Sequence, residues 1–469
     1  MTGIVRAASS YTCLVSIPGP SDPDALRRVE EALATRWPED QIDPTLDRMR
    51  ALVDVLGHPE RTYPVIHVTG TNGKTSTARM IESLLRTLGL RTGRFTSPHL
   101  ESYTERIAID GQPVTPERFA ALFDEVIPFV ELVDRDQPVR MSFFEVLTAM
   151  AYAAFADAPV DVAVVEVGLG GLWDATNVAD GLVSVVTPIA LDHERYLGHD
   201  LESIAGEKAG IIKPGATAVL ADQPLAAAEQ LVRHAVEFEA TIAREGVEFG
   251  VVSREIAVGG QQVELQGLAG RYPEVFVPLH GEHQAHNAAT ALAAVEAFLG
   301  AGPGGLTLDL ESVQEAFSRV TSPGRLEVVR RSPTVVVDAA HNPAGAQVAA
   351  AAIDETFRFQ RLVGVVGVMT DKDARGILEA LEVVLDEIVV TENDSHRAMP
   401  AAELAAVADD VFGTDRVHTE PDLPTALDQA ITLAESGPDI TRAGVLVAGS
   451  VVTAGNARAL LRRRGAARS

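Results

Sequence analysis

Residues 64–77 have the types and spacing that could hold the phosphate chain of a nucleotide. A short apolar run leads to Gly70, a second glycine follows at Gly73, and the pattern then becomes helical. Glycines let backbone N–H groups face an anion, a helix N-terminus adds a positive dipole, and Lys74 adds a full charge. Val68 stands where the usual motif has its first glycine, so the spacing is the shortened Gly-x-x-Gly-Lys-Thr. The predicted phosphate-binding residues are Gly70, Thr71, Asn72, Gly73, Lys74, Thr75 and Ser76.

Several polar residues stand where predicted apolar strands end. Glu166 comes one residue before the end of a nearly all-apolar strand, and Asp192 and His193 follow the next apolar strand. Asp338 ends a strand much later in the chain and leads into His341. Ligands of parallel sheets bind beyond the carboxyl ends of the strands. We therefore expect these residues to share one active site with the phosphate-binding loop.

Two of these residues are candidate cation ligands. The carboxylate of Glu166 suits Mg²⁺, and the hydroxyl of either Thr75 or Ser76 could reach the same ion. The imidazole of His193 is a less usual magnesium ligand, and its chemistry alone favours zinc or manganese. The residue types therefore predict a cation site without fixing one metal.

The elements that must position these residues follow an alternating order. Apolar strands alternate with helical segments through most of the chain, which predicts parallel sheets in more than one α/β domain. A fresh alternation begins near residues 321–325, the best candidate for a domain boundary. Residues 246–279 predict a small antiparallel patch, and residues 224–243 predict a helix. Lys208 lies on another helical segment, where a lone lysine is most often a surface residue whose charged end reaches water.

The composition narrows the class of protein. The 469 residues carry a formal net charge of −27 and no obvious basic face, so we expect no nucleic-acid partner. No apolar run is long enough to span a membrane, and the first 22 residues read as a leader without the apolar core of a signal peptide. The single cysteine, Cys13, excludes an intrachain disulfide and fits a cytoplasmic location. An anionic substrate would need local positive charge or metal ions at the site.

The motifs together resemble the Mur-ligase-like superfamily, and within it the folylpolyglutamate synthases and dihydrofolate synthases. The resemblance covers nearly everything from residue 43 to the C-terminus. The most specific motifs are Thr-Gly-Thr-Asn-Gly-Lys-Thr at 69–75, Thr-Ser-Pro-His-Leu at 96–100, Glu-Val-Gly-Leu-Gly-Gly at 166–171, Asp-Ala-Thr-Asn at 174–177, Glu-Lys-Ala-Gly-Ile at 207–211, Pro-Gly-Arg at 323–325 and Asp-Ala-Ala-His-Asn-Pro at 338–343. The family has arginine where this chain has Leu172.

The resemblance implies an α/β fold with two main domains. A leader and first helix at 1–42 would precede a P-loop ATPase domain with a mostly parallel sheet at 43–321. A smaller C-terminal Rossmann-like α/β domain would follow at 322–469, with the active site in the cleft between the two domains.

The resemblance also implies a role for each matching residue. Lys74, Lys208, Asp338 and His341 would be the catalytic residues, and Lys208 would be carbamylated. Ser97 and Glu166 would hold one Mg²⁺ and His193 a second, so the resemblance overrides the zinc or manganese interpretation. The phosphate-loop residues would bind ATP together with Asn287, Arg325 and Asp338. The folate and glutamate side would comprise Phe143, Phe144, Asp174, His341 and Ser450.

The implied reaction is ATP-dependent amide ligation. ATP would activate a pteroate or folate carboxylate as an acyl phosphate, and the amine of L-glutamate would displace the phosphate. The substrates would be small molecules, and we expect a monomer with no membrane partner. A cell-wall Mur ligase is the nearest alternative, but two helices and a leader fill the 69 residues where those enzymes carry a UDP-sugar domain. A non-catalytic nucleotide-binding protein is the other alternative, and the set Lys74, Glu166, His193 and Lys208 argues against it.

Overall fold

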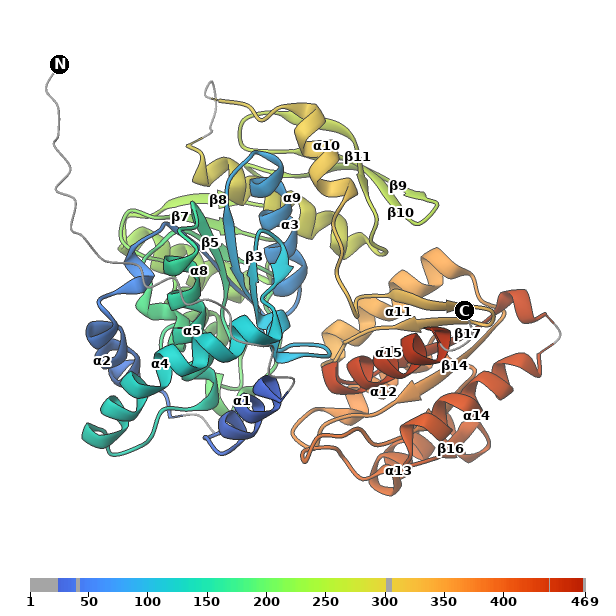
Figure 1. Ribbon diagram of the computed structural model, residues 1–469. Coiled ribbons are helices and arrows are strands. Elements are labelled where there is room, and N and C mark those ends of the chain that lie inside the picture. The colour runs from blue at the N-terminus through green and yellow to red at the C-terminus, as the bar shows by residue number, and fades with distance from the viewer. Residues whose placement is uncertain (1–23, 39–42, 301–305, 438, 467–469) are drawn as a thin grey trace, which may run out of the picture.

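The computed structural model describes residues 24–38, 43–300, 306–437 and 439–466 (Figure 1). The predicted leader and Cys13 lie outside these residues. The described strands form an eight-stranded sheet, a three-stranded sheet and a six-stranded sheet. Figure 1 shows the eight-stranded and six-stranded sheets in separate halves of the molecule, which we call the N-terminal and C-terminal halves.

The sheet of the N-terminal half has the strand order β4-β3-β2-β5-β1-β6-β7-β8. Six of its strands run parallel, and β3 and β4 form an antiparallel edge. Every residue of β1 and β5 is buried, as their apolar sequences predict for central strands covered on both faces. The bounds are β1 Val65–Thr69, β2 Thr92–Phe95, β3 Ile107–Ile109, β4 Gln112–Pro113, β5 Val162–Glu166, β6 Gly181–Val186, β7 Thr217–Leu220 and β8 Thr241–Arg244.

Helices cover both faces of this sheet. One face packs against α3 (Lys74–Thr87), α9 (Glu282–Phe298) and α10 (Leu310–Ser318), together with the three-stranded sheet of β9 (Gly250–Ala257), β10 (Gly260–Gln266) and β11 (Arg271–Val277). The other face packs against α1 (Ala25–Ala34), α2 (Asp47–Leu56), α4 (Pro116–Asp136), α5 (Phe143–Asp157), α7 (Leu201–Ala209) and α8 (Leu225–Glu237). The short elements are α6 (Glu194–Leu197), η1 (Pro59–Arg61), η2 (Tyr103–Arg106) and η3 (Ala175–Val178).

The sheet of the C-terminal half has the order β12-β13-β17-β14-β15-β16. Its strands are β12 (Glu327–Arg331), β13 (Thr334–Val337), β14 (Arg361–Val366), β15 (Glu387–Val390), β16 (Val417–Thr419) and β17 (Ala443–Ala448). One face packs against α11 (Pro343–Phe357), α12 (Ala374–Glu382) and α13 (Ala401–Phe412), and the other against α14 (Leu423–Glu435) and α15 (Val451–Ala466). The short helices are η4 (Thr414–Arg416) and η5 (Ile440–Arg442).

The structure confirms the predicted fold class, an α/β fold with a mostly parallel first sheet and a second, smaller α/β unit. The antiparallel patch at 246–279 is confirmed by β9, β10 and β11. The predicted helix at 224–243 is wrong at its end, because α8 stops at Glu237 and β8 pairs with β7 from Thr241. The predicted boundary at residue 321 falls between α10 and β12, which belong to different halves.

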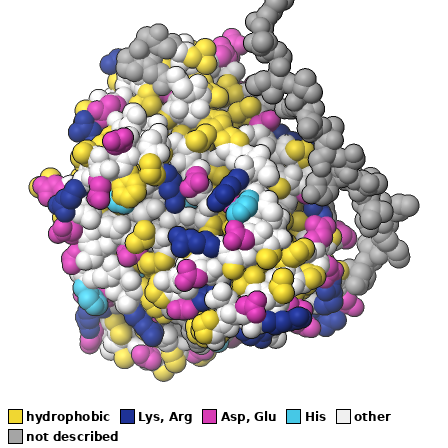
Figure 2. Space-filling model, turned by 90° about the vertical axis from the view of Figure 1, so that its left-hand side faces the viewer, with side chains coloured by type: hydrophobic (Ala, Val, Ile, Leu, Met, Phe, Trp, Pro, Cys, Tyr) yellow, Lys and Arg dark blue, Asp and Glu magenta, His cyan; other side chains and the backbone are white. Residues whose placement is uncertain are grey.

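The described helices include none that is both long enough and apolar enough to cross a membrane. On the face shown in Figure 2, Lys and Arg side chains are scattered among acidic ones and do not gather into a patch. That face therefore offers no basic surface for a polyanion, in keeping with the net charge of −27.

Candidate active site

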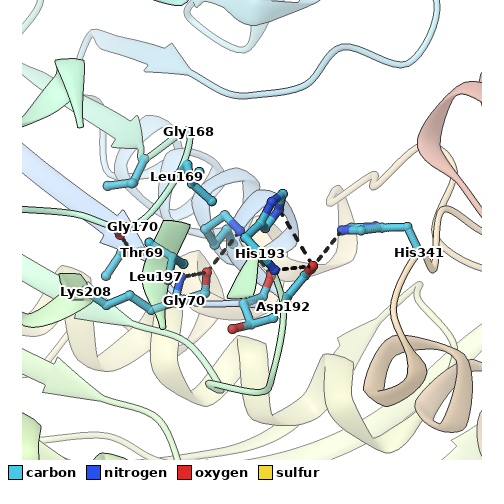
Figure 3. A pocket seen from close by; sticks show the side chains of 13 residues that line it. Thr69, Gly70, Gly168, Leu169, Gly170, Asp192, His193, Leu197, Lys208 and His341 are labelled. Carbon is cyan, nitrogen blue, oxygen red and sulfur yellow. Dashed lines mark hydrogen bonds and ion pairs between the residues drawn. The ribbon is translucent and has the colours of Figure 1, made fainter. Parts of the chain in front are cut away.

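The candidate site lies beyond the carboxyl ends of β1, β5 and β6, where a loop of the C-terminal half meets them (Figure 3). Figure 3 shows His341 reaching towards Asp192 from the opposite side of the pocket from Lys208. We call this space the cleft pocket. Its lining residues are Thr69, Gly70, Thr71, Lys74, Val167, Gly168, Leu169, Gly170, Asp192, His193, Leu197, Lys208 and His341.

The phosphate-binding loop connects β1 to α3 and requires its two glycines. Gly70 has φ +143° and Gly73 has φ +89°, and a Cβ on Gly70 would lie 1.9 Å from the hydroxyl of Thr187. A Cβ on Gly73 would lie 2.6 Å from Oδ1 of Asn287 on α9, so the predicted adenine-side residue does lie against the loop. Lys74 begins α3, and its Nζ donates to the carbonyls of Gly70 and Thr71, both at 3.1 Å. Burial lowers the pKa of Lys74.

Glu166 ends β5 and faces the first turn of α3. Its Oε1 accepts a hydrogen bond from the hydroxyl of Thr75 at 3.0 Å, and the N–H of Ser97 also interacts with the carboxylate. Its Oε2 is buried and has no hydrogen-bond partner within the described residues. Burial raises the pKa of Glu166, and the nearby charge of Lys74 opposes that shift. The hydroxyl of Ser76 instead contacts that of Ser322 at 2.9 Å, so Thr75 is the hydroxyl beside the carboxylate.

The donor set fits a magnesium site that is completed by the substrate. Glu166 supplies a carboxylate oxygen without a protein partner, and the nearly buried Ser97 supplies a hydroxyl. The described part of the chain contains no cluster of three His, Cys, Asp or Glu side chains that could hold a metal ion alone. Mg²⁺ commonly takes one or two protein ligands and completes its shell with phosphate oxygens and water. The residues therefore suit Mg²⁺ better than a dedicated zinc site.

Asp192 is the centre of a contact between the two halves. Its Oδ1 accepts from Nζ of Lys372 at 2.5 Å, and its Oδ2 accepts from Nδ2 of Asn342 at 2.9 Å. Nε2 of His341 lies 3.6 Å from Oδ2. Burial would raise the pKa of Asp192, but electrostatic interactions with His193, Lys372 and His341 outweigh it and hold the pKa well below its usual range; at neutral pH only Lys372 of these three carries a charge. The ionised carboxylate of Asp192, in the N-terminal half, therefore lies in contact with three side chains of the C-terminal half.

Lys208 is buried, so the interpretation of a lone surface lysine is wrong. Its side chain runs from α7 to the phosphate loop, where Nζ donates to the carbonyl of Gly70 at 2.8 Å. Burial, together with the charge of Lys74, lowers the pKa of Lys208 to about 7. With this pKa, the amine of Lys208 is uncharged in about half of the molecules at neutral pH, and the uncharged amine is the form that reacts as a nucleophile.

His341 and His193 are both neutral at pH 7. Burial and the charge of Lys372 lower the pKa of His341 to about 4, and burial lowers that of His193 to about 3. Nδ1 of His341 lies 2.9 Å from the carbonyl of Ala339 and carries the proton there, which leaves Nε2 as an acceptor facing Asp192. Nε2 of His193 lies 3.4 Å from Nζ of Lys372.

The remaining predicted residues lie outside the lining of the cleft pocket. Asp338 accepts from the N–H groups of Leu326 and Ala340, so it holds the linker beside Arg325, whose guanidinium bonds only to the carbonyl of Gly324 among the described hydrogen bonds. Burial raises the pKa of Asp338.

The folate-side candidates also make mainly structural contacts. Asp174 accepts from the N–H groups of Leu169 and Thr176 and so fixes the glycine-rich turn after β5. The ring of Phe144 lies 2.4 Å from where a Cβ on Gly168 would stand. Phe143 lies edge-on to Tyr103, with ring centroids 5.6 Å apart. Oγ of Ser450 accepts a hydrogen bond from the N–H of Thr453.

Sequence reasoning missed Lys372 and Asn342, and it placed Asp192 in the active site without assigning it a function. The side chains of Asn342 and Asn72 exchange hydrogen bonds of 3.2 Å, which joins the phosphate loop to the C-terminal half. Lys372 follows β14 at the carboxyl edge of its sheet, so the rule used for Glu166 could have identified it. No sequence motif pairs it with Asp192, because 180 residues separate the two.

Comparison with known proteins identifies the family of the chain. Residues 68–295 match the Mur ligase middle domain, and residues 324–451 match the glutamate ligase domain of Mur ligases. The chain is 52% identical over 468 residues to the dihydrofolate synthase/folylpolyglutamate synthase of Mycobacterium tuberculosis, covering 95% of this chain and 96% of that protein. It is 35% identical over 365 residues to the enzyme of the same name from Escherichia coli, covering 77% and 81%.

Solved structures give the same result. The M. tuberculosis folylpolyglutamate synthase complexed with ADP superposes with a TM-score of 0.89 at 53% identity, covering 93% of this chain and 98% of that one. E. coli FolC in complex with DHPP and ADP superposes with a TM-score of 0.81 at 31% identity, covering 96% and 100%. The chain therefore belongs to the folylpolyglutamate synthase/dihydrofolate synthase family of the Mur ligase superfamily.

Proposed function

We propose that this chain is an ATP-dependent ligase that adds L-glutamate to dihydropteroate, to the γ-carboxylate of reduced folates, or to both. The observation that carries the proposal is the cleft pocket with Lys74 of the phosphate loop and His341 of the C-terminal half in its lining, and with the charge of Lys74 acting on the buried carboxylate of Glu166. Relatives that carry both synthase names, and one bound to DHPP and ADP, support the substrate class.

The first step joins two anions. An oxygen of the substrate carboxylate attacks the γ-phosphorus of ATP, the bond from that phosphorus to the β,γ-bridging oxygen breaks, and ADP leaves. Lys74 and Arg325 would offset the repulsion, with the loop N–H groups around the phosphates. Mg²⁺ held by Ser97 and Glu166, with a second ion at His193, would supply further charge neutralisation when bound.

The second step forms the amide. The amine of L-glutamate attacks the acyl carbon, a C–N bond forms, and the C–O bond to phosphate breaks with its electrons leaving on phosphate. The amine must lose a proton, and Nε2 of the neutral His341 is placed to accept it. Asp192 and Lys372 hold the halves together around this pocket, which keeps water from the acyl phosphate.

Release of phosphate tests the proposal. We expect phosphate from ATP only when L-glutamate and a pterin acceptor are both present, with dihydropteroate and tetrahydrofolate assayed in parallel. Formation of the glutamylated product should match the phosphate released, as the acyl-phosphate route requires. Phosphate release that instead needs a UDP-muramyl peptide would replace this proposal with a cell-wall ligase.

Carbamylation of Lys208 is the second expectation. Its uncharged amine would attack CO₂, forming an N–C bond and losing a proton, and the resulting carboxylate would lie beside the phosphate loop. Because the pKa is about 7, the uncharged fraction and therefore the carbamate should rise as the pH increases from 6 to 8. We expect a carbamate carbon signal in ¹³C NMR with labelled bicarbonate, which is lost in Lys208→Ala. Lys213→Ala is the matched control and should keep the signal; a signal that survives Lys208→Ala contradicts the assignment.

The wider predictions form part of the same proposal. The division into 43–321 and 322–469 is supported by the separate sheets of the two halves. A cytoplasmic monomer acting on small molecules, with no nucleic-acid or membrane partner, remains what we expect of the chain.

A further inference from the structure

Arg458 links two acidic residues that lie far from it in the sequence. It lies on α15, its side chain is 10% exposed, and its Nε donates to Oε2 of Glu327 at 2.6 Å. Its Nη1 donates to Glu101 of the N-terminal half. Glu327 is two residues beyond Arg325, and Glu101 is four residues beyond Ser97. One guanidinium therefore joins the segments that carry two predicted active-site residues.

The backbone of α15 lies directly against the same loop. A Cβ on Gly455 would stand 2.0 Å from the carbonyl oxygen of Leu100, so no side chain fits there. The partly buried side chain of Leu100 packs against the apolar cluster between the C-terminal sheet and its helices α14 and α15. It also lies within 3.0 Å of where a Cβ on Gly324 would stand. Leu100 is thus a partly buried residue of the N-terminal half that packs against the core of the C-terminal half.

The loop that receives these contacts is held as one piece. The carboxylate of Glu105 accepts from the N–H groups of Leu100, Glu101 and Ser102 at 2.9, 3.0 and 3.0 Å. The N–H of Ser97, at the start of the loop, interacts with Glu166. Because these three N–H groups share one carboxylate, a displacement of Glu101 would also displace the neighbouring backbone that leads to Ser97.

The linker is held from the same point. Oε2 of Glu327 accepts from Arg458 and also from the N–H of Gly324 at 2.8 Å. Gly324 has φ +68° and precedes Arg325. Loss of the Arg458 side chain would remove one of the two hydrogen bonds to Oε2 of Glu327, and the linker around Gly324 and Arg325 would be less restrained. Charge-assisted bonds from a largely buried guanidinium are directional and fix geometry as well as adding energy.

We propose that Arg458 is a positioning residue for the ligase reaction, holding the loop of Ser97 and the linker of Arg325 against α15 so that the two halves of the site stay in register. This inference rests on the proposed function. Ser450, the predicted glutamate-side residue, directly precedes the first residue of α15. In Figure 1, α15 runs across the front of the C-terminal sheet, and one of its ends points towards the N-terminal half.

Steady-state kinetics give the first test. We expect Arg458→Ala to lower kcat about tenfold to a hundredfold, because small displacements of reacting groups cost rates of this size. The KM for ATP should change less than about threefold, since among the described residues Arg458 donates hydrogen bonds to Glu101 and Glu327 and none to the phosphate loop. Arg458→Lys keeps the charge and should recover part of kcat. Arg462→Ala removes an exposed arginine of the same helix and should leave kcat within about twofold of the parent.

Hydrogen exchange gives a test that needs no ligase activity. In Arg458→Ala, the amides of residues 100–102 should exchange faster by about tenfold, while those of β1 and β5 keep their rates. Glu101→Gln should produce the same local change, and adding it to Arg458→Ala should lower kcat no further. If the chain has no folate ligase activity, the proposed function fails while this local result can still be read.

Three results would overturn the inference. The first is a kcat of Arg458→Ala within twofold of the parent. The second is additive loss of kcat in the Glu101→Gln and Arg458→Ala double variant, which would show that the pair does not act together. The third is faster exchange throughout the N-terminal half, which would show a general loss of stability; Arg458→Lys and Glu101→Gln keep the test readable if Arg458→Ala does not fold.

Discussion

Replacing Glu166 with glutamine should lower kcat by about a thousandfold while the protein stays folded. The carboxylate has one oxygen bonded to Thr75 and the other buried without a partner among the described residues, beside Lys74. A single electrostatic contact to the transition state is worth about a hundredfold to a thousandfold, and loss of a metal ligand adds to that. The amide keeps the shape and the bond to Thr75 but removes the charge that would hold a cation. Phosphate release under saturating substrates measures the effect.

The stability of the same variant separates chemistry from folding. Burial is the largest influence on the pKa of Glu166 and raises it, so the ionised carboxylate is less stable in the folded protein than in water. Removing that charge should leave Tm unchanged or higher. Glu202→Gln is the control, because it removes a charge from an exposed position of α7. Near-normal kcat in Glu166→Gln, or a large fall in Tm that accounts for lost activity, would contradict the assigned role.

The phosphate loop and Glu166 were predictable because their signals are local. A β-strand, two glycines and a lysine at the start of a helix lie within one short segment, and the structure confirms each of these elements. Glu166 stood out as the charged residue in an apolar strand, and its burial follows from that pattern. The expectation that ligands bind beyond the carboxyl ends of parallel strands also brought Asp192, His193 and His341 together, and all three line the cleft pocket.

Other contacts were out of reach because they join distant segments. The pairing of Asp192 with Lys372 depends on how two separately folded halves meet, which no periodicity encodes. The position of Lys208 depends on the direction in which α7 crosses the sheet, and its burial reversed the residue-based interpretation. The sequence around β8 predicts a helix because Ala240 and Ala243 favour that state, and pairing with β7 makes residues 241–244 a strand instead.

Acidification should destabilise the protein well above the pH at which ordinary carboxylates titrate. Burial lowers the pKa of seven described histidines, and for five of them it does so strongly: to about 3 for His67, His99 and His193 and to about 4 for His283 and His341. In the unfolded chain each has a pKa of about 6.5. Between pH 6.5 and about 4 the unfolded state therefore binds more protons, so the free energy of unfolding falls as the pH falls.

The expected size is large against the usual stability of a protein. Each such histidine lowers the free energy of unfolding by about 1.4 kcal/mol per pH unit once the pH is below 6.5, so five lower it by roughly 6 kcal/mol between pH 7 and 5.5. Typical stabilities are about 5–15 kcal/mol. The buried carboxyl groups of Glu166, Asp174 and Asp338 have raised pKa values and act in the opposite direction, because the folded state takes up their protons first.

One histidine isolates the effect from the carboxyl groups. His67 lies in the buried centre of β1, its Nε2 is 2.9 Å from the hydroxyl of Thr176, and its Nδ1 has no partner within the described residues. His67→Gln can keep the contact to Thr176 but cannot titrate. Denaturant unfolding followed by fluorescence of Trp37 and Trp173, both in the N-terminal half, should show a pH slope reduced by about one proton, or roughly 1.4 kcal/mol per pH unit between pH 6 and 5. The exposed His199 is the control, and an unchanged slope in His67→Gln would show that its protonation does not drive acid unfolding.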